Sequence, residues 1–143
     1  MEELIKRAAS DLRSCTYGIA LSGAGMSTES GLADFRGPRG IWKTDPQAEA
    51  KAYQRYETFL SDPRSYWEEM LGTVGSGSQY YEQIRQAGPN PGHFAMSKLE
   101  QTGIIKCTIT QNIDGLHERA GSSQGIHYHG TVEKLRCISC GSR

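Results

Sequence analysis

The stretch from Ser22 to Arg36 constrains the fold more than any other part of the chain. It follows the short apolar run Ile19–Leu21, which predicts a buried strand. Gly23 and Gly25 then allow the backbone to turn sharply and to approach a ligand closely. The hydroxyl side chains that can cap a helix beginning just after these glycines are Ser27, Thr28 and Ser30. A strand, a glycine turn and a helix start in this order present backbone N–H groups and a helix dipole to phosphate, so the stretch predicts a nucleotide pyrophosphate site.

A glycine pair alone is weak support for such a site, because many turns of this kind bind nothing. The strict dinucleotide fingerprint also fails, since its third glycine would fall on Thr28. However, Asp34, Phe35 and Arg36 follow closely and add a carboxylate, an aromatic ring and a guanidinium. An ordinary surface loop would not need all three, so a nucleotide site remains the favoured interpretation.

A second strand is predicted from Ile104 to Thr110, because this run is rich in β-branched residues. Polar side chains follow it directly at Gln111, Asn112 and Asp114. In an open α/β sheet, ligands bind beyond the carboxyl ends of the strands. If the two strands are parallel, the glycine turn and these polar residues lie in one crevice.

The remaining elements are predicted from helical spacing, caps and turn residues. Helices are expected at Glu2–Ser14, from Asp62–Pro63 through Leu71, at Ser78–Ala87 and from Asn90 to near Gly103, with loops at Gly37–Ala52 and Gly72–Gly77. We expect the first loop to be mobile, as suits a lid over a cofactor, and Trp42 to anchor it.

Composition excludes some classes of protein. The 143 residues carry 16 Lys and Arg against 16 Asp and Glu, which argues against general or direct nucleic-acid binding. No apolar run is long enough to cross a bilayer, and the acidic start Met1–Glu3 is unlike a signal peptide. We therefore expect a soluble, cytoplasmic protein without a membrane partner. The pattern of four cysteines does not suggest a disulfide framework.

Two segments resemble the sirtuins, the NAD-dependent protein deacylases. The first holds the family's opening motif at Gly23–Ser27, Ser30–Gly31 and Asp34–Gly37, although the usual proline before the Asp-Phe-Arg is here Ala33. The second matches the family's Thr-Gln-Asn-Ile-Asp-x-Leu-His-x-x-Ala-Gly segment at every fixed position from Thr110 to Gly121. A third, shorter segment, Pro89–His93, is similar to the family's Pro-Asn-x-x-His; we expect His93 and His117 to be structural.

The resemblance implies the fold and the domain division. It implies an α/β fold in which residues 1–36 and 88–130 form a Rossmann-like parallel sheet part. Residues 37–87 would form a loop and helical insert, and residues 131–143 would begin a zinc-ribbon module. Because the family continues beyond this point, we expect the chain to be truncated, with the C-terminal part of the catalytic core absent.

The resemblance also implies an NAD-dependent protein-lysine deacetylase that releases nicotinamide and O-acetyl-ADP-ribose and acts on acetylated-lysine proteins. His129 would be the general base, with Asn112 as the second catalytic residue. The residues that would contact NAD are Gly23, Ala24, Gly25, Ser27, Asp34, Phe35, Arg36, Gln111, Asn112 and Asp114. The choice of His129 over His127, which shares its face in an extended chain, rests on the resemblance.

Cys137 and Cys140 have the spacing that grips one edge of a tetrahedral metal, but a redox-active or inert pair has the same spacing. The resemblance implies Zn²⁺, with a second ligand pair that this chain does not contain. Family members specific for acidic acyl groups carry Tyr-x-x-Arg; here Tyr66 is followed at that spacing by Glu69, and Tyr53 by Tyr56, so acetyl is expected. A mono-ADP-ribosyltransferase with the same NAD site and a non-catalytic fragment remain alternatives.

Overall fold

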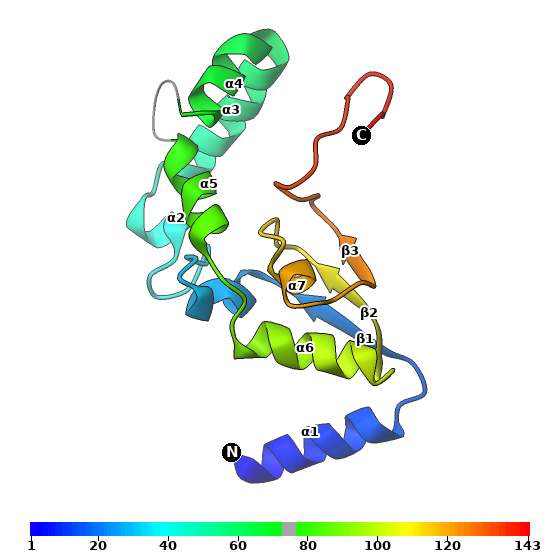
Figure 1. Ribbon diagram of the computed structural model, residues 1–143. Coiled ribbons are helices and arrows are strands. Elements are labelled where there is room, and N and C mark those ends of the chain that lie inside the picture. Colours follow the sequence, from blue (N-terminus) through cyan, green and yellow to red (C-terminus); the bar gives the residue numbers. More distant parts are fainter. Residues whose placement is uncertain (73–76) are drawn as a thin grey trace. The chain divides into compact units, whose positions relative to one another are not determined.

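The computed structural model describes residues 1–72 and 77–143, and the side chains outside 73–79. Its elements, in chain order, are α1 (Glu2–Ser14), β1 (Gly18–Ser22), the 3-10 helix η1 (Ala24–Ser30), α2 (Ile41–Thr44), α3 (Ala48–Ser61), α4 (Pro63–Met70), α5 (Gly77–Gln86), α6 (Pro91–Gln101), β2 (Ile105–Thr110), α7 (Leu116–Arg119) and β3 (Gly125–His127) (Figure 1).

The chain divides into two compact units. The first, called here the sheet unit, comprises Met1–Met26 and Gly88–Arg143; the second, the helical unit, comprises Ser27–Ala87. The helix η1 begins in the sheet unit and ends in the helical unit.

The sheet unit is built on a parallel sheet in the order β1–β2–β3. Ser22 pairs with Thr110, and Thr110 pairs with His127, so the carboxyl ends of all three strands meet at one edge (Figure 1). The prediction that the first two strands are parallel is therefore confirmed, and with it the α/β class.

One face of this sheet is covered by helices α6 and α7, and the other is open. Thr108 and Thr110 on the covered face are almost fully buried. Ser22, which bonds to Thr110, also contacts His117 of α7, whose ring packs on His93 of α6. On the opposite face the side chains of Ile19, Leu21 and Ile126 are each more than half exposed. The sheet therefore has a polar, buried face and an apolar, solvent-facing one.

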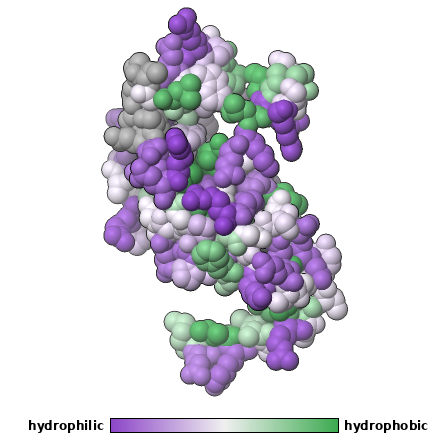
Figure 2. Space-filling view, in the orientation of Figure 1, coloured by the Kyte–Doolittle hydropathy of each residue, from purple (hydrophilic) through white to green (hydrophobic). Residues whose placement is uncertain are grey.

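The predicted helix at Glu2–Ser14 is confirmed with the same bounds, and none of its residues is buried. Leu4, Ile5 and Leu12 are exposed. Figure 2 shows apolar atoms along one side of this helix and polar atoms along the other. The amphipathic pattern is thus present, and no element among the described residues buries its apolar stripe.

The helical unit contains α2 to α5. Its α4 begins as expected, with the Asp62 side chain accepting a hydrogen bond from the Ser65 N–H at 3.2 Å and Pro63 at the first position. Phe59 of α3 and Tyr66 of α4 pack edge to face at 5.0 Å between ring centroids. Buried Leu32, Ile84 and Ala87 complete its apolar interior.

The prediction of an irregular loop over Gly37–Ala52 is wrong in part, because α2 and the start of α3 lie in this range. The loop was predicted because this range contains few apolar residues. Helix α2 and the start of α3 are stabilised by local hydrogen bonds rather than by burial. Most of the predicted loop at Gly72–Gly77 falls outside the described residues. Within the part of the chain that is described, no helix combines the length and apolar character that a bilayer crossing requires.

Candidate functional site

Two polar segments meet where β1 and β2 end. The Gln111 N–H donates to the Ser22 carbonyl at 3.0 Å, which extends the strand ladder by one residue. A Cβ added to Gly23 would lie 3.8 Å from Nε2 of Gln111, so the Gln111 side chain stands beside the glycine turn. The structure therefore brings together the two segments that the sequence placed in one crevice.

The glycine turn leads directly into η1. The Met26 N–H donates to the Gly23 carbonyl at 2.9 Å, and the Asn90 side-chain amide donates to the Met26 carbonyl at 2.8 Å. A Cβ added to Gly25 would meet no atom within 4 Å. The backbone at Gly25 is thus open to close approach by another molecule, as a phosphate-binding turn requires.

The segment after β2 is held in a fixed conformation by its own polar side chains. The Asn112 N–H donates to Oγ1 of Thr110 at 3.1 Å. Oδ1 of Asp114 accepts the Leu116 N–H at 3.0 Å at the start of α7, and Gly115 adopts a left-handed conformation with φ of 67°. Asp114 is buried, so its carboxylate has a structural role in the turn in addition to any role in binding a ligand.

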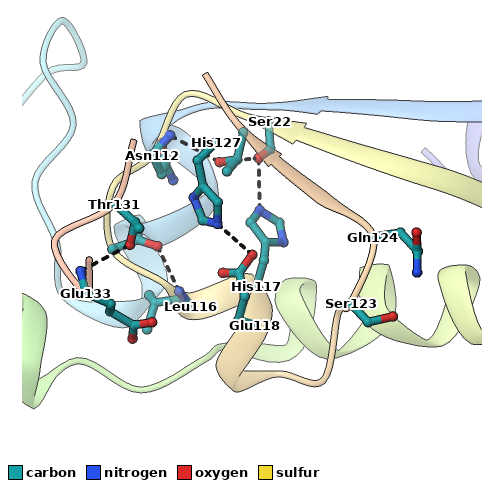
Figure 3. Close-up of polar contacts among 12 residues, drawn as sticks. Ser22, Asn112, Leu116, His117, Glu118, Ser123, Gln124, His127, Thr131 and Glu133 are labelled. Atoms are coloured by element: carbon teal, nitrogen blue, oxygen red, sulfur yellow. Dashed lines mark hydrogen bonds and ion pairs between the residues drawn. The ribbon is translucent and has the colours of Figure 1, made fainter. Parts of the chain in front are cut away.

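A buried hydrogen-bond network lies beneath these strand ends (Figure 3). Ser22 Oγ donates to Thr110 Oγ1 at 2.9 Å and lies 2.9 Å from Nε2 of His117. Because the Ser22 hydroxyl proton is directed at Thr110, His117 acts as the donor to Ser22. The His117 ring packs edge to face on the His93 ring at 5.0 Å between centroids.

Burial lowers the pKa of both histidines. For His93 the nearby His117 lowers the pKa further, and for His117 burial outweighs the opposing effect of Glu118 and Asp114. His93 also closes a capping box at the start of α6, with its Nδ1 accepting the Asn90 N–H at 3.2 Å. Both histidines therefore have structural roles in the neutral state, as their sequence contexts indicated.

The structure separates His127 from His129. Nε2 of His127 lies 2.9 Å from Oε1 of Glu118 on α7, and only 18% of its side chain is exposed (Figure 3). His129 is exposed, and its ring contacts the ring of Tyr128 at 4.9 Å between centroids. His127 is thus engaged by a carboxylate, whereas His129 presents its imidazole to solvent.

In the helical unit, Asp34, Phe35 and Arg36 lie on a tight loop that closes on itself. The backbone N–H groups of Ile41 and Trp42 donate to the carbonyls of Asp34 and Phe35 at 2.8 and 3.1 Å. The Trp42 ring lies 5.2 Å from the Phe35 ring and 4.3 Å from the Arg36 guanidinium carbon. Trp42 was expected to anchor the loop to the core, but these ring contacts lie within the loop itself, on Phe35 and Arg36.

Beside this loop is a pocket of about 630 Å³. It is lined by Thr28, Gly31, Leu32, Ala33, Asp34, Pro38 and Arg39. Ser27, the other predicted cofactor residue in the helical unit, is the buried residue of η1.

Cys137 and Cys140 lie in one turn near the chain end, where the Gly141 N–H donates to the Cys137 carbonyl at 2.9 Å. Hydrogen bonds from Ser142, and a further one from Cys137, lower the pKa of the Cys140 thiol to about 7. A thiol with a pKa of about 7 is partly ionised near neutral pH, and the thiolate is the form that binds metals. However, the two cysteines supply only half of the four ligands of a tetrahedral metal site. Among the described residues, no group of three or more His, Cys, Asp or Glu could hold a metal ion.

Two acidic residues at this site carried no sequence-based prediction. Glu118 occupies a variable position of the second motif, and Glu100 accepts three hydrogen bonds from Ser123 and Gln124. Neither glutamate is at a short, recognisable spacing in the sequence from the residues that it contacts. Only the position of β3 in the structure therefore reveals their roles.

Comparison with known proteins gives consistent matches. The sequence profile of the family described as "Sir2 family" matches residues 23–143. An NAD-dependent protein deacetylase of Saccharolobus solfataricus is 41% identical over 138 residues, which cover 96% of this chain and 51% of that protein. An NAD-dependent protein deacylase 2 of Archaeoglobus fulgidus is 40% identical over 141 residues, covering 98% and 51%.

Solved structures show the same similarity. A mutant Sir2 homologue in complex with ADP-ribose has a TM-score of 0.71 at 36% identity and covers 95% of this chain and 51% of that one. A complex of Sir2 with a p53 peptide and NAD⁺ has a TM-score of 0.68 at 36% identity and covers 96% and 50%. The chain therefore spans about half the length of the relatives it matches.

Proposed function

The chain belongs to the Sir2 family, and from that premise we propose that it supplies the NAD-binding edge and the general base of an NAD-dependent protein-lysine deacetylase. The observation that carries the proposal is the meeting of the glycine turn and the Gln111–Asp114 segment at one edge of a parallel sheet. This edge is where open α/β sheets bind nucleotides.

Within this proposal the chain's residues bind and orient NAD, which is consumed as a substrate. Backbone N–H groups of Gly23, Ala24 and Gly25 would face the pyrophosphate, because the turn is open at Gly25. Asn112 and Asp114 would orient the nicotinamide and its ribose, with Gln111 beside them.

From the family resemblance we also propose cofactor contacts for the loop of the helical unit. Asp34, Phe35 and Arg36 would shape the site around the nicotinamide ribose, and Ser27 would support the helix that follows the turn. The loop is already closed by its own backbone hydrogen bonds. This supports the proposed role, because residues that are ordered before a ligand binds lose less entropy on binding.

His129 would be the general base. NAD supplies the electrophilic ribose carbon, from which nicotinamide leaves as the acyl oxygen of the substrate lysine attacks. His129 then accepts a proton from a ribose hydroxyl, whose oxygen attacks the bound acyl carbon. Addition of water and departure of the lysine amine then give free lysine and O-acetyl-ADP-ribose. The exposed imidazole of His129 supports this assignment over His127, which Glu118 engages.

The acyl group proposed is acetyl. At the third position after Tyr66 stands Glu69, and its carboxylate pairs with Arg55 at 3.2 Å. This position therefore supplies no guanidinium to pair with an acidic acyl group. Cys137 and Cys140 would hold one edge of a Zn²⁺ ion that orders the chain end, with two further ligands from outside the present residues.

The test is nicotinamide release from NAD with an acetyl-lysine peptide, measured for the chain beside its His129→Ala variant. The matched control is Tyr17→Ala, an exposed residue before the opposite end of β1. We expect repeated nicotinamide release with loss of acetyl that requires the peptide and persists in the control. In His129→Ala the release should stop after at most one nicotinamide per chain, with no loss of acetyl, while NAD binding persists in all three. Labelled ADP-ribose on protein without loss of acetyl would favour the ADP-ribosyltransferase instead, and absence of NAD binding would identify a non-catalytic fragment.

A further inference from the structure

β3 carries His129 only two residues beyond its end, yet the strand itself has three residues. It pairs with β2 through Thr108, Ile109 and Thr110. An edge strand this short gains little stability from its backbone hydrogen bonds to β2. Its position therefore depends on side chains of neighbouring elements that contact it.

Glu118 holds the end of β3. Its Oε1 lies 2.9 Å from Nε2 of His127, and a Cβ added to Gly125 would lie 2.9 Å from the same oxygen. The carboxylate thus fits against two successive residues of the same strand face. The exposed fractions of the two side chains are 18% for His127 and 34% for Glu118, so the pair is shielded from bulk water more than surface ion pairs are.

Glu100 holds the entry to β3. Its Oε1 accepts hydrogen bonds from the Ser123 N–H, the Ser123 hydroxyl and the Gln124 N–H at 2.7, 3.1 and 3.1 Å. Burial opposes ionisation of Glu100, but these hydrogen bonds outweigh it and lower its pKa. Two carboxylates from two helices therefore fix the strand at its start and its end.

Backbone hydrogen bonds bracket His129 on both sides. The Tyr128 N–H donates to the Thr110 carbonyl at 2.9 Å, and the Val132 N–H donates to the Ile113 carbonyl at 3.0 Å. Figure 3 shows the segment from Thr131 to Glu133 lying against the turn that begins α7. His129 is thus tied to the segment that contains Asn112 and Asp114, while its own ring remains exposed.

We propose that Glu118 and His127 form a positioning pair for His129, in which the contact between Oε1 of Glu118 and Nε2 of His127 fixes the end of β3 and thereby the place of His129 next to the Gln111–Asp114 segment. The catalytic consequence rests on the proposed function; the positional consequence does not. Neither residue touches the reacting atoms in this scheme, so both act through His129.

The central variant is Glu118→Gln, which keeps the size of the side chain and removes its charge. Glu49→Gln on the exposed start of α3 is the matched control. Two readouts that do not require activity are the ¹H–¹³C resonance of the His129 ring and the hydrogen-exchange rate of the Tyr128 amide. We expect Glu118→Gln to shift the first and to accelerate the second about tenfold, with no change in the control.

Where the chain releases nicotinamide, Glu118→Gln should lower kcat about tenfold and leave KM within about twofold, since ground-state binding does not involve His129. The double variant Glu118→His with His127→Glu restores an ion pair with exchanged partners, and it should recover most of the loss. His127→Gln gives the same phenotype as Glu118→Gln and serves where one single variant fails to fold.

An unchanged His129 resonance and unchanged Tyr128 exchange in a folded Glu118→Gln chain would overturn the proposal. Failure of the exchanged pair to restore either readout would also overturn it, because a space-filling role predicts no such rescue. Absence of nicotinamide release in the unsubstituted chain would contradict the proposed function, while the resonance and exchange measurements still decide the positioning pair.

Discussion

The two predicted halves of the NAD site are held by opposite means. In the sheet unit, the strand ends are fixed by residues far apart in the sequence, since Ser22 bonds to His117 across 95 positions. In the helical unit, Asp34, Phe35 and Arg36 are fixed by contacts that all lie between Asp34 and Trp42. The first arrangement requires the complete sheet unit, whereas the second is a property of a short loop.

This difference predicts that the two motifs tolerate substitutions differently. A network of buried hydrogen bonds fails as a unit, because each lost partner leaves another polar group unsatisfied. A loop closed by backbone hydrogen bonds and stacked rings loses only the contact that is removed. The following experiments test whether that contrast is correct.

The largest expected effect is on the buried network. Ser22→Ala would leave Nε2 of His117 without its partner, although Nδ1 of that ring already lacks one among the described residues. We expect a loss of about 1–3 kcal/mol in the free energy of unfolding, measured by urea denaturation. Ser10→Ala on exposed α1 is the control and should change it by less than about 0.5 kcal/mol. Equal losses of stability in Ser22→Ala and Ser10→Ala would contradict the proposed difference between the buried network and the helical-unit loop.

Lowering the pH should weaken the same network. Burial holds the folded-state pKa values of His93 and His117 below the ordinary histidine value of 6.5, so the unfolded chain binds more protons below that pH. The stability due to the two neutral rings is complete above about pH 6.5 and decreases as pH falls below it. A urea midpoint that stays constant from pH 8 to pH 5 would contradict this expectation.

The two units offer separate reporters for this titration. All four histidines lie in the sheet unit, and both tryptophans, Trp42 and Trp67, lie in the helical unit. While the chain remains folded, tryptophan fluorescence should therefore keep its pH 8 value as histidine resonances change.

A substitution in the glycine turn should lower NAD affinity and leave the stability of the fold unchanged. Gly25→Ala places a Cβ where no atom of the chain lies within 4 Å. Because that space would be occupied by the pyrophosphate, we expect NAD affinity to fall about tenfold or more by calorimetry, with an unchanged urea midpoint. Gly88→Ala, whose added Cβ is equally free of contacts, should change neither quantity. Unchanged NAD affinity in Gly25→Ala would place the pyrophosphate elsewhere.

The helical-unit loop should respond more weakly. Trp42→Ala removes the ring that contacts both Phe35 and Arg36. A cation–π contact at a partly exposed site contributes about 0.5–1 kcal/mol, so NAD affinity should fall about two- to fivefold. Trp67→Phe, which changes the other tryptophan of the unit, is the control. A loss as large as that of Gly25→Ala would show that the loop is not locally independent.

The smallest effect is expected on the open face of the sheet. Ile126 is 54% exposed, and Ile126→Thr keeps a β-branched side chain in β3. The free energy of unfolding should change by less than about 0.5 kcal/mol in urea denaturation. A larger loss would mean that another surface covers this face in solution.

Much of the fold could be predicted because its signals are local. The apolar runs ending at Leu21 and Thr110, the spacing of Leu4 to Leu12 and the Asp62–Pro63 start identified elements that the structure contains. The helices between Gly37 and Ala52 were missed, because their sequence has few apolar residues and their caps carry no side-chain hydrogen bond.

The sequence by itself determined the strand runs, the glycine turn and the helix caps, because these signals act within a few residues. The parallel arrangement was a condition of the argument, and the residues proposed to contact NAD came from the resemblance to the sirtuins. Only the tertiary structure decided that Glu118 engages His127, that Glu100 holds the start of β3 and that Trp42 contacts Arg36. The physical reason is that a carboxylate or an aromatic ring fits many partners equally well. Which partner it meets is set by strand register and helix placement, and no spacing along the chain encodes these directly.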